Sequence, residues 1–268
     1  ARGEAEAMHV VQPGTSRLLA AIGERELHAA GASLDPVRLD ATRTIVGAHE
    51  PIRRVYFPDT CLIALSLMLP DGRTAGVTMV GDEGLVGLSA AVGVPAVTDA
   101  VVLVPGAARS ISADRFRGAM HSSERMRSVV EAYAVALQAH LAQTVACNRL
   151  HSLDQRAARW LLLAHDRVPG ESFPLTQEAF ADLLGVSRPA VSTVGARFAR
   201  AGAAEFRRGT VHIVDVERLE QASCDCLEAD RDAFQAVAPE PASMRSLARV
   251  PDSPRGLSMI RPQIRRAR

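Results

Sequence analysis

The 268-residue chain contains no lysine, so arginine supplies all 31 of its basic side chains. Aromatic residues make up 4% of the sequence, with one tryptophan, and there are four cysteines. So few cysteines exclude a small disulfide-bonded scaffold. With 47% hydrophobic and 23% charged residues, the chain is predicted to be globular rather than disordered, with about two domains.

Long hydrophobic runs are also missing. The apolar stretch over residues 61–70 has the length of a strand and falls far short of the ~20 residues of a membrane-spanning helix. Residues 1–8 lack the apolar core and small-residue cleavage site of a signal peptide. We therefore expect a cytoplasmic protein with no membrane partner. The net charge of +1 indicates no partner by itself, because nucleic-acid binding depends on local charge.

The four cysteines, Cys61, Cys147, Cys224 and Cys226, do not have a familiar metal-binding spacing. A C-x-C pair with two distant single cysteines matches no common zinc or iron-sulfur pattern, and no histidine cluster completes one. The sequence therefore predicts reduced, buried thiols, no metal site and no cofactor.

The hydrophobic spacing of the N-terminal half changes along the chain. Residues 16–30 are predicted to form an amphipathic helix behind the cap residue Ser16. Residues 34–105 contain short apolar runs separated by proline and glycine, with a hairpin turn predicted at Asp71 and Gly72. Many short strands in so few residues predict a β-barrel or a rolled sandwich.

A helix without proline or glycine is predicted over residues 121–149. Its stripe of side chains recurs in alternating steps of four and three residues, which is the spacing of a coiled-coil seam and predicts dimerisation. The same stripe would serve equally well to pack the helix against the barrel, and the sequence leaves both interpretations open. The stripe consists of Met126, Val130, Tyr133, Leu137, His140 and Thr144.

A second domain is predicted from residue 150, where Ser152 and Gln155 have the spacing of a helix capping box. Within it, residues 175–202 follow the pattern of a helix-turn-helix. Thr176 and Ser187 can cap the two helices, and Gly185 can supply the left-handed turn between them.

Polar residues at the start of the second of these helices predict contacts with DNA. An arginine there can bond to the O6 and N7 atoms of guanine in the major groove. Residues 203–215 add two β-rich runs joined at Arg208 and Gly209, like the wing of a winged helix. Between residues 188 and 212, five arginines and one glutamate give a local charge of +4, which suits phosphates. The predicted DNA-contacting residues are Thr176, Gln177, Ser187, Arg188, Pro189, Ser192, Thr193, Arg197, Arg207 and Arg208.

Both ends of the chain are predicted to lack regular structure. Residues 1–15 are expected to form a flexible N-terminus, and residues 227–268 lose hydrophobic periodicity. Between residues 245 and 268, seven arginines and one aspartate give a charge of +6. The sequence predicts a disordered basic tail, which either adds non-specific DNA affinity or has no role.

Residues 16–226 resemble the Crp/Fnr family of bacterial transcription regulators. The resemblance rests on LTQEAFADLLGVSRPAVS in the helix-turn-helix and on the segments VYFPDTCLIALSL, DGRTAGVTMVGDEGLVGL and CNRLHSLDQRAARWLL. It implies an α+β protein with a cyclic-nucleotide-binding-like, jelly-roll-like β-barrel over residues 16–120. A dimerisation helix over residues 121–149 and a winged helix-turn-helix over residues 150–226 would follow. A homodimer would then read a pseudo-palindromic site on double-stranded DNA, and RNA polymerase is a further candidate partner.

The resemblance also implies residue roles. Arg188 falls on the family's main base-reading arginine, and Ser187 falls on a cap that contacts phosphate. Pro189 and Thr193 stand where the family's cyclic-AMP sensors carry glutamate and arginine, so we expect a different operator.

The sensor domain departs further from the family's pattern. In nucleotide-binding members a glutamate holds the ribose and an arginine holds the cyclic phosphate. Here Leu85 stands at the glutamate position, and Thr98 and Asp99 stand near the expected arginine. A phosphate facing Asp99 without an arginine would bind poorly, so we expect no binding of cyclic AMP in the usual way. The family's oxygen sensors cluster cysteines near the N-terminus, so we expect no iron-sulfur sensor either. The candidate ligand pocket consists of Gly84, Leu85, Gly87, Leu88, Thr98 and Asp99.

Two other functions compete with a DNA-binding regulator. Pro189 and the small residues after it would also suit a ligand- or protein-binding module whose winged helix no longer binds DNA specifically. For an enzyme, the sequence offers no G-x-S-x-G, H-E-x-x-H, Walker-type or clustered-carboxylate pattern. The neighbouring acids Asp82 and Glu83 would point to opposite faces of a strand. We therefore predict a transcription regulator and no enzymatic activity.

Overall fold

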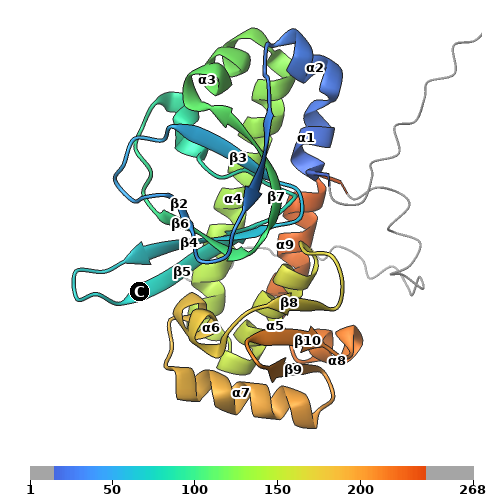
Figure 1. Ribbon diagram of the computed structural model, residues 1–268. Coiled ribbons are helices and arrows are strands. Elements are labelled where there is room, and N and C mark those ends of the chain that lie inside the picture. Colours follow the sequence, from blue (N-terminus) through green and yellow to red (C-terminus); the bar gives the residue numbers. More distant parts are fainter. Residues whose placement is uncertain (1–14, 240–268) are drawn as a thin grey trace, which may run out of the picture.

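The computed structural model describes residues 15–239, and the chain starts with a domain built on two antiparallel sheets (Figure 1). Burial alternates along residues 99–104, so this strand turns one side toward the core. The predicted hairpin turn is confirmed: Gly72 has a φ of 82°, a conformation that favours glycine. The sheets have the orders β1-β7-β3 and β2-β6-β4-β5. The strands are β1 (Asp35–Leu39), β2 (Thr44–Val46), β3 (Arg54–Pro58), β4 (Leu62–Met68), β5 (Thr74–Val80), β6 (Asp99–Val104) and β7 (Gly106–Ser112).

Short helices flank these sheets. The helix predicted over residues 16–30 is divided in two, because Gly23 with a φ of 95° ends the first helix and begins the second. Ser16 caps the first helix as predicted, since its side chain accepts a hydrogen bond from the Leu19 backbone. The elements are α1 (Arg17–Ile22), α2 (Glu24–Ala29), the 3-10 helix η1 (Leu88–Val92) and α3 (Ala113–Ser122).

Helix α4 (Glu124–Leu150) runs from the two-sheet domain toward the C-terminal domain (Figure 1). It begins at the cap residue Ser123, close to the predicted start. The stripe predicted from the sequence faces inward: Met126, Val130, Tyr133, His140 and Thr144 are buried within the chain, and Leu137 is half-buried. Of the two interpretations left open, the structure therefore favours packing within the chain over dimerisation through this stripe.

The C-terminal domain has the predicted order of elements, with one strand that the sequence analysis missed. The capping box of Ser152 and Gln155 is present, with both reciprocal hydrogen bonds. The missed strand, β8, pairs with β10 and makes the wing a three-stranded sheet in the order β8-β10-β9. The elements are α5 (Leu153–His165), β8 (Ser172–Pro174), α6 (Gln177–Leu184), α7 (Arg188–Arg200), β9 (Ala204–Arg207), β10 (Thr210–Ile213) and α8 (Val216–Gln221).

A last helix, α9 (Cys226–Gln235), contradicts the prediction that structure ends at residue 226. It lies beside α4 (Figure 1) and buries Leu227, Asp230 and Phe234 at helical spacing. The prediction was wrong because the middle position of this stripe is a charged residue, which hides the hydrophobic period. The rest of the predicted tail, residues 240–268, and the N-terminal residues 1–14 lie outside the described residues.

A buried polar network explains the aspartate on that stripe. The Asp230 carboxylate contacts the Arg159 guanidinium at 2.6 Å and His140 Nδ1 at 2.9 Å, and the Arg159 and Asp230 side chains are fully buried. Arg159 also donates to the Thr144 hydroxyl, and His140 Nε2 lies 2.9 Å from the Thr78 hydroxyl. The network joins α4, α5, α9 and β5, so removal of one member leaves buried polar groups without partners.

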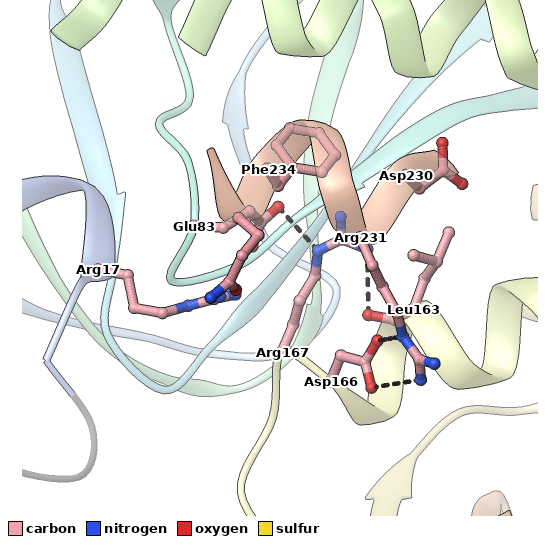
Figure 2. Close-up of a pocket in the computed structure, with 9 residues that line it drawn as sticks. Arg17, Glu83, Leu163, Asp166, Arg167, Asp230, Arg231 and Phe234 are labelled. Atoms are coloured by element: carbon pink, nitrogen blue, oxygen red, sulfur yellow. Dashed lines mark hydrogen bonds and ion pairs between the residues drawn. The ribbon is translucent and has the colours of Figure 1, made fainter. Parts of the chain in front are cut away.

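Ion pairs formed by arginine also surround the part of α9 that carries Arg231 and Phe234 (Figure 2). Arg231 reaches Asp166 at 2.8 Å, and Arg167, buried under Phe234, reaches Glu83 at 2.7 Å. The space among these side chains is about 40 Å³, enough for water but not for a ligand. Asp82 pairs separately with Arg17 at 2.9 Å, so both neighbouring acids considered in the sequence analysis form ion pairs with arginine.

Within residues 15–239, no helix is both long enough and apolar enough to cross a membrane.

Candidate functional site

Helices α6 and α7 form the predicted helix-turn-helix. The Thr176 hydroxyl accepts a hydrogen bond from the Ala179 backbone at 3.1 Å and so caps α6. Gly185, with a φ of 65°, makes the left-handed turn after α6. Val191, Val194 and Phe198 bury one side of α7, which turns the opposite side of the helix outward.

The start of α7 is the exposed end of this unit. Ser187, Arg188 and Pro189 are exposed, and 65% of the Arg188 side chain is accessible. Its guanidinium lies 4.0 Å from the Glu178 carboxylate, a contact at the limit of an ion pair. Such a loose, solvated contact contributes little, so Arg188 can exchange it for a base or phosphate. Thr193 is exposed one turn further along, and its hydroxyl donates to the Pro189 carbonyl.

Gln177 and Ser192 connect the two helices. The Ser192 hydroxyl donates to Gln177 Oε1 at 2.6 Å, and both side chains are half-buried. This hydrogen bond positions α7 against the start of α6. The structure therefore gives these two predicted DNA-contacting residues a role in holding the helices together.

Arg197 is paired within the chain. Its guanidinium binds the Asp154 carboxylate at the start of α5 through two hydrogen bonds, one of them 2.8 Å long. This ion pair raises the pKa of Arg197. Because a carboxylate already neutralises its charge, Arg197 anchors α7 to α5 and is not available as the predicted phosphate contact without breaking that pair.

The wing presents two more of the predicted arginines. Arg208 and Gly209 form the turn between β9 and β10, both with positive φ, as the sequence predicted. Arg207 and Arg208 are exposed, and Arg207 pairs with Glu205. Phe206 packs on Phe180 with ring centres 5.8 Å apart and so fixes the wing against α6.

The two-sheet domain contains a second candidate site, a cavity of about 630 Å³ between the β-strands, η1 and α4. Most of its lining residues are apolar. Among the lining residues, Arg127 and Glu131 on α4 are charged, and His121 at the end of α3 also lines the cavity. The strands contribute no charged side chain to it.

Four of the six predicted pocket residues line this cavity, namely Leu85, Gly87, Leu88 and Thr98. Gly84 does not, because it packs against Tyr133, where an added Cβ would lie 2.5 Å from the phenol oxygen. Asp99 does not either, because its carboxylate accepts a hydrogen bond from the Ala48 backbone at 2.9 Å. Gly84 and Asp99 are therefore not part of the pocket.

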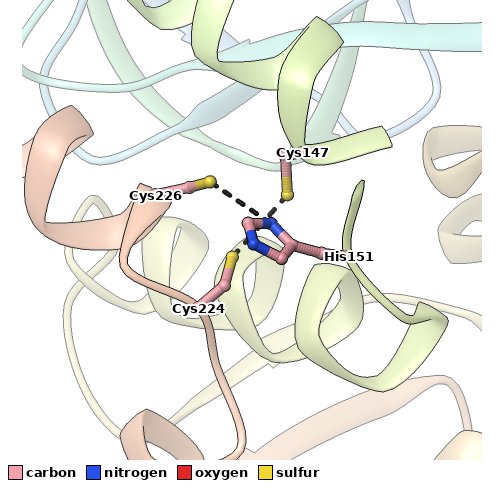
Figure 3. A group of neighbouring side chains, drawn as sticks. All are labelled: Cys147, His151, Cys224 and Cys226. Carbon is pink, nitrogen blue, oxygen red and sulfur yellow. Dashed lines mark hydrogen bonds between the residues drawn. The ribbon is translucent and has the colours of Figure 1, made fainter. Parts of the chain in front are cut away.

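The structure also brings together four residues that the sequence analysis did not connect, Cys147, His151, Cys224 and Cys226 (Figure 3). Their ligand atoms all lie within 4.8 Å of one another, so the folded chain assembles a group that could hold a metal ion, although the spacing in the sequence predicted no metal site. Burial raises the pKa of Cys224 to about 12 and also raises that of Cys147. The sequence signals were the C-x-C pair and the i, i+4 spacing of Cys147 and His151, but the two pairs are more than 70 residues apart in the chain. Cys61, the fourth cysteine, is a buried thiol elsewhere, as predicted.

Residues 155–222 match the family model of the Crp-like helix-turn-helix domain. No curated protein matches the sequence.

Among solved structures, a CRP-family transcriptional regulator of Thermus thermophilus is 24% identical to this chain, with a TM-score of 0.59. The alignment covers 72% of this chain and 99% of the Thermus protein. FixK2 of Bradyrhizobium japonicum is 18% identical, with a TM-score of 0.60, covering 72% of this chain and 98% of its own. The c-di-GMP-responsive regulator CLP of Xanthomonas campestris is 15% identical, with a TM-score of 0.56, covering 74% of this chain and 100% of its own. These findings confirm the predicted resemblance: the chain has the fold of the Crp/Fnr regulators and carries a Crp-like helix-turn-helix DNA-binding domain.

Proposed function

We propose that this protein is a transcription regulator that reads a specific DNA sequence with the start of helix α7. The observation that carries the proposal is the exposed Arg188 in the first turn of a helix whose other side is buried in the domain. A guanidinium at that position can form two hydrogen bonds with guanine in the major groove. Arg208 on the wing is exposed and would contact phosphate beside it, and Arg207 would do so by exchanging Glu205 for the phosphate.

The protein acts as a homodimer in this proposal, with α4 as the contact between subunits. Because the predicted stripe is buried, the contact uses the opposite side of the helix. That side exposes Val135 and Val145, which are 66% and 63% accessible, together with the small residues Ala139 and Ala142. Small side chains let two helices approach closely. Two copies of α7 would then face half-sites about 34 Å apart on a pseudo-palindromic operator.

The cavity of the two-sheet domain accepts an apolar effector rather than cyclic AMP. The resemblance places the arginine for a cyclic phosphate near Thr98 and Asp99, whereas the one arginine among the lining residues, Arg127, lies on α4 beside Glu131. Titration calorimetry with cyclic AMP should give no heat of binding at micromolar concentrations. Tight binding in this range would refute this part of the proposal.

The role of Arg188 is tested by the Arg188→Ala variant. Loss of a bidentate contact should cost about 1–3 kcal/mol at one base pair of each half-site and relax the sequence preference there. Fluorescence anisotropy on the operator and on its single-base variants measures both effects. Arg115→Ala, which removes an exposed arginine on α3, is the matched control and should change nothing.

If Arg188→Ala weakens binding to all sequences equally, Arg188 contacts phosphate and is not the base reader.

The dependence of affinity on salt distinguishes a DNA-binding regulator from a module that binds a protein or a small molecule. Affinity for the operator should fall steeply with added salt, because DNA binding releases counterions. A complex with no such dependence would contradict DNA binding.

A further inference from the structure

The cluster of Cys147, His151, Cys224 and Cys226 lies at the junction of the two domains (Figure 3). Cys147 is in the last turn of α4, and His151 is the residue that ends this helix. Cys224 precedes α9, and Cys226 is its first residue. The chain therefore brings together the end of one helix and the start of another that packs beside it.

The distances within the cluster fit a single tetrahedral ion. Zinc bonds of about 2.3 Å to sulfur and about 2.0 Å to nitrogen place two sulfurs about 3.8 Å apart and a sulfur and a nitrogen about 3.5 Å apart. The Sγ atoms of Cys147 and Cys224 are 3.7 Å apart, and Cys226 Sγ is 3.4 Å from His151 Nδ1. The remaining pairs lie within 4.8 Å, so they need to move closer by at most about 1.3 Å.

A disulfide does not account for the cluster as well. Its sulfur atoms would be about 2.05 Å apart, and one bond would leave the third cysteine and the histidine unused. A cluster of several iron atoms would divide the four ligands among different irons and hold the ligands of different irons further apart than a single ion does. Three cysteines and one histidine around one centre are a known ligand set of structural zinc.

The surroundings suit bound thiolates. Gln143 Nε2 donates a hydrogen bond to Cys226 Sγ at 3.0 Å. Such donors orient metal ligands and stabilise their negative charge. Cys226 also stands at the N-terminus of α9, where the helix dipole favours an anion. Cys147 and Cys226 are buried whereas His151 and Cys224 are partly accessible, so an ion can reach the site from solvent.

We propose that Cys147, His151, Cys224 and Cys226 bind one Zn²⁺ as a closed, structural Cys3His site. The ion ties the end of α4 to the start of α9, and it fixes the backbone at residue 151, where α4 passes into the DNA-binding domain. Binding displaces the three thiol protons into solvent, and the histidine binds in its neutral form through Nδ1. The protein fills all four positions of the tetrahedron. The ion therefore stabilises the fold and has no open position for a substrate.

The test uses the full chain purified with a reductant and without added chelator. Elemental analysis should find one zinc per chain. Cys224→Ser should lower the zinc content at least tenfold, whereas Cys61→Ala, which removes the buried cysteine outside the cluster, should keep it. Gln143→Ala should retain the ion with an affinity about 10-fold weaker, because it removes a donor to the ligand and not a ligand.

Cobalt replaces zinc in a second measurement on the unaltered chain, which does not depend on the folding of any variant. After removal of zinc, titration with Co²⁺ should saturate at one equivalent and give thiolate-to-cobalt charge-transfer bands together with the intense visible bands of a tetrahedral site. A chain that binds neither zinc nor cobalt would overturn the proposal. So would a Cys147–Cys224 disulfide in the chain as purified with the reductant, or unchanged metal binding by Cys224→Ser.

Discussion

At the scale of single residues, Gly76 shows how closely the two domains meet. It lies in β5, and a Cβ added there would be 2.7 Å from the Cα and the carbonyl oxygen of Leu183 in α6. These are backbone atoms and cannot rotate away. The helix-turn-helix is therefore seated on the β4–β5 hairpin through a contact that only glycine permits.

We predict that Gly76→Ala destabilises the protein by about 1–3 kcal/mol, because the added methyl group must push the strand and the helix apart. Urea denaturation followed by circular dichroism measures the effect. Gly118→Ala is the matched control: Gly118 is helical and nothing lies within 4 Å of an added Cβ, so the same change should stabilise the protein by up to about 1 kcal/mol. Equal effects of the two substitutions would contradict the contact.

At the scale of elements, the sequence predicted the regular parts of the fold and missed those that depend on distant contacts. The α6–turn–α7 unit was predictable because caps, a glycine turn and a buried stripe are local signals, as at Thr176 and Gly185. Helix α9 was missed because its inner face carries a charged residue, Asp230. That residue is buried because it pairs with Arg159, which is distant in the sequence. The metal-ligand cluster was missed for the same reason, since residues 147 and 224 meet only in the folded chain.

The buried pair of Asp230 and Arg159 gives α9 its position. Asp230→Ala leaves a buried guanidinium without a counterion and should cost about 3–5 kcal/mol in unfolding free energy. Thermal or urea unfolding measures this loss. Asp232→Ala, which removes an exposed carboxylate from the same helix, should change stability by less than about 0.5 kcal/mol. A small effect at both positions would show that α9 does not depend on the pair.

The same network predicts a dependence of stability on pH. Burial lowers the pKa of His140 below its ordinary value of 6.5, and Arg167 and Arg159 act in the same direction, against the opposing effect of Asp230. The unfolded chain therefore takes up this proton at a higher pH than the folded chain does. Stability from this group is fully present above pH 6.5 and is lost as the pH falls toward the folded pKa.

Urea denaturation at a series of pH values between 4 and 8 tests this effect. His140→Gln removes the titrating group and should flatten the decline below pH ~6.5. His28→Gln, a change at an exposed histidine, should leave the decline as it is in the unaltered protein. A decline that is the same in the His140→Gln variant would contradict this account.

At the scale of the whole molecule, α4 connects the cavity, the metal-ligand cluster and the DNA-binding domain. Its inner side carries the buried stripe, of which Val130 and Leu137 also line the cavity, and its end carries Cys147. The outward side remains for a second copy of the chain. A ligand in the cavity and a partner subunit would thus act on the same helix.

If two subunits meet through the outward side of α4, Val135→Glu places a charge in the contact between them. The variant should shift the chain from dimer to monomer in sedimentation equilibrium, because a buried, unpaired carboxylate is costly in an interface. Val214→Glu, at a valine that is 56% exposed in the DNA-binding domain, should leave the dimer intact. If Val135→Glu remains dimeric, the subunits meet elsewhere.

Selection of bound fragments from a random DNA pool by the full chain tests whether helix α7 reads a specific DNA sequence. We expect an enriched motif of two inverted half-sites with centres about 10–10.5 base pairs apart. In the same selection, Arg188→Ala should lose preference at one base pair of each half-site. No enriched motif, or the same motif from the unaltered chain and from Arg188→Ala, would contradict the account.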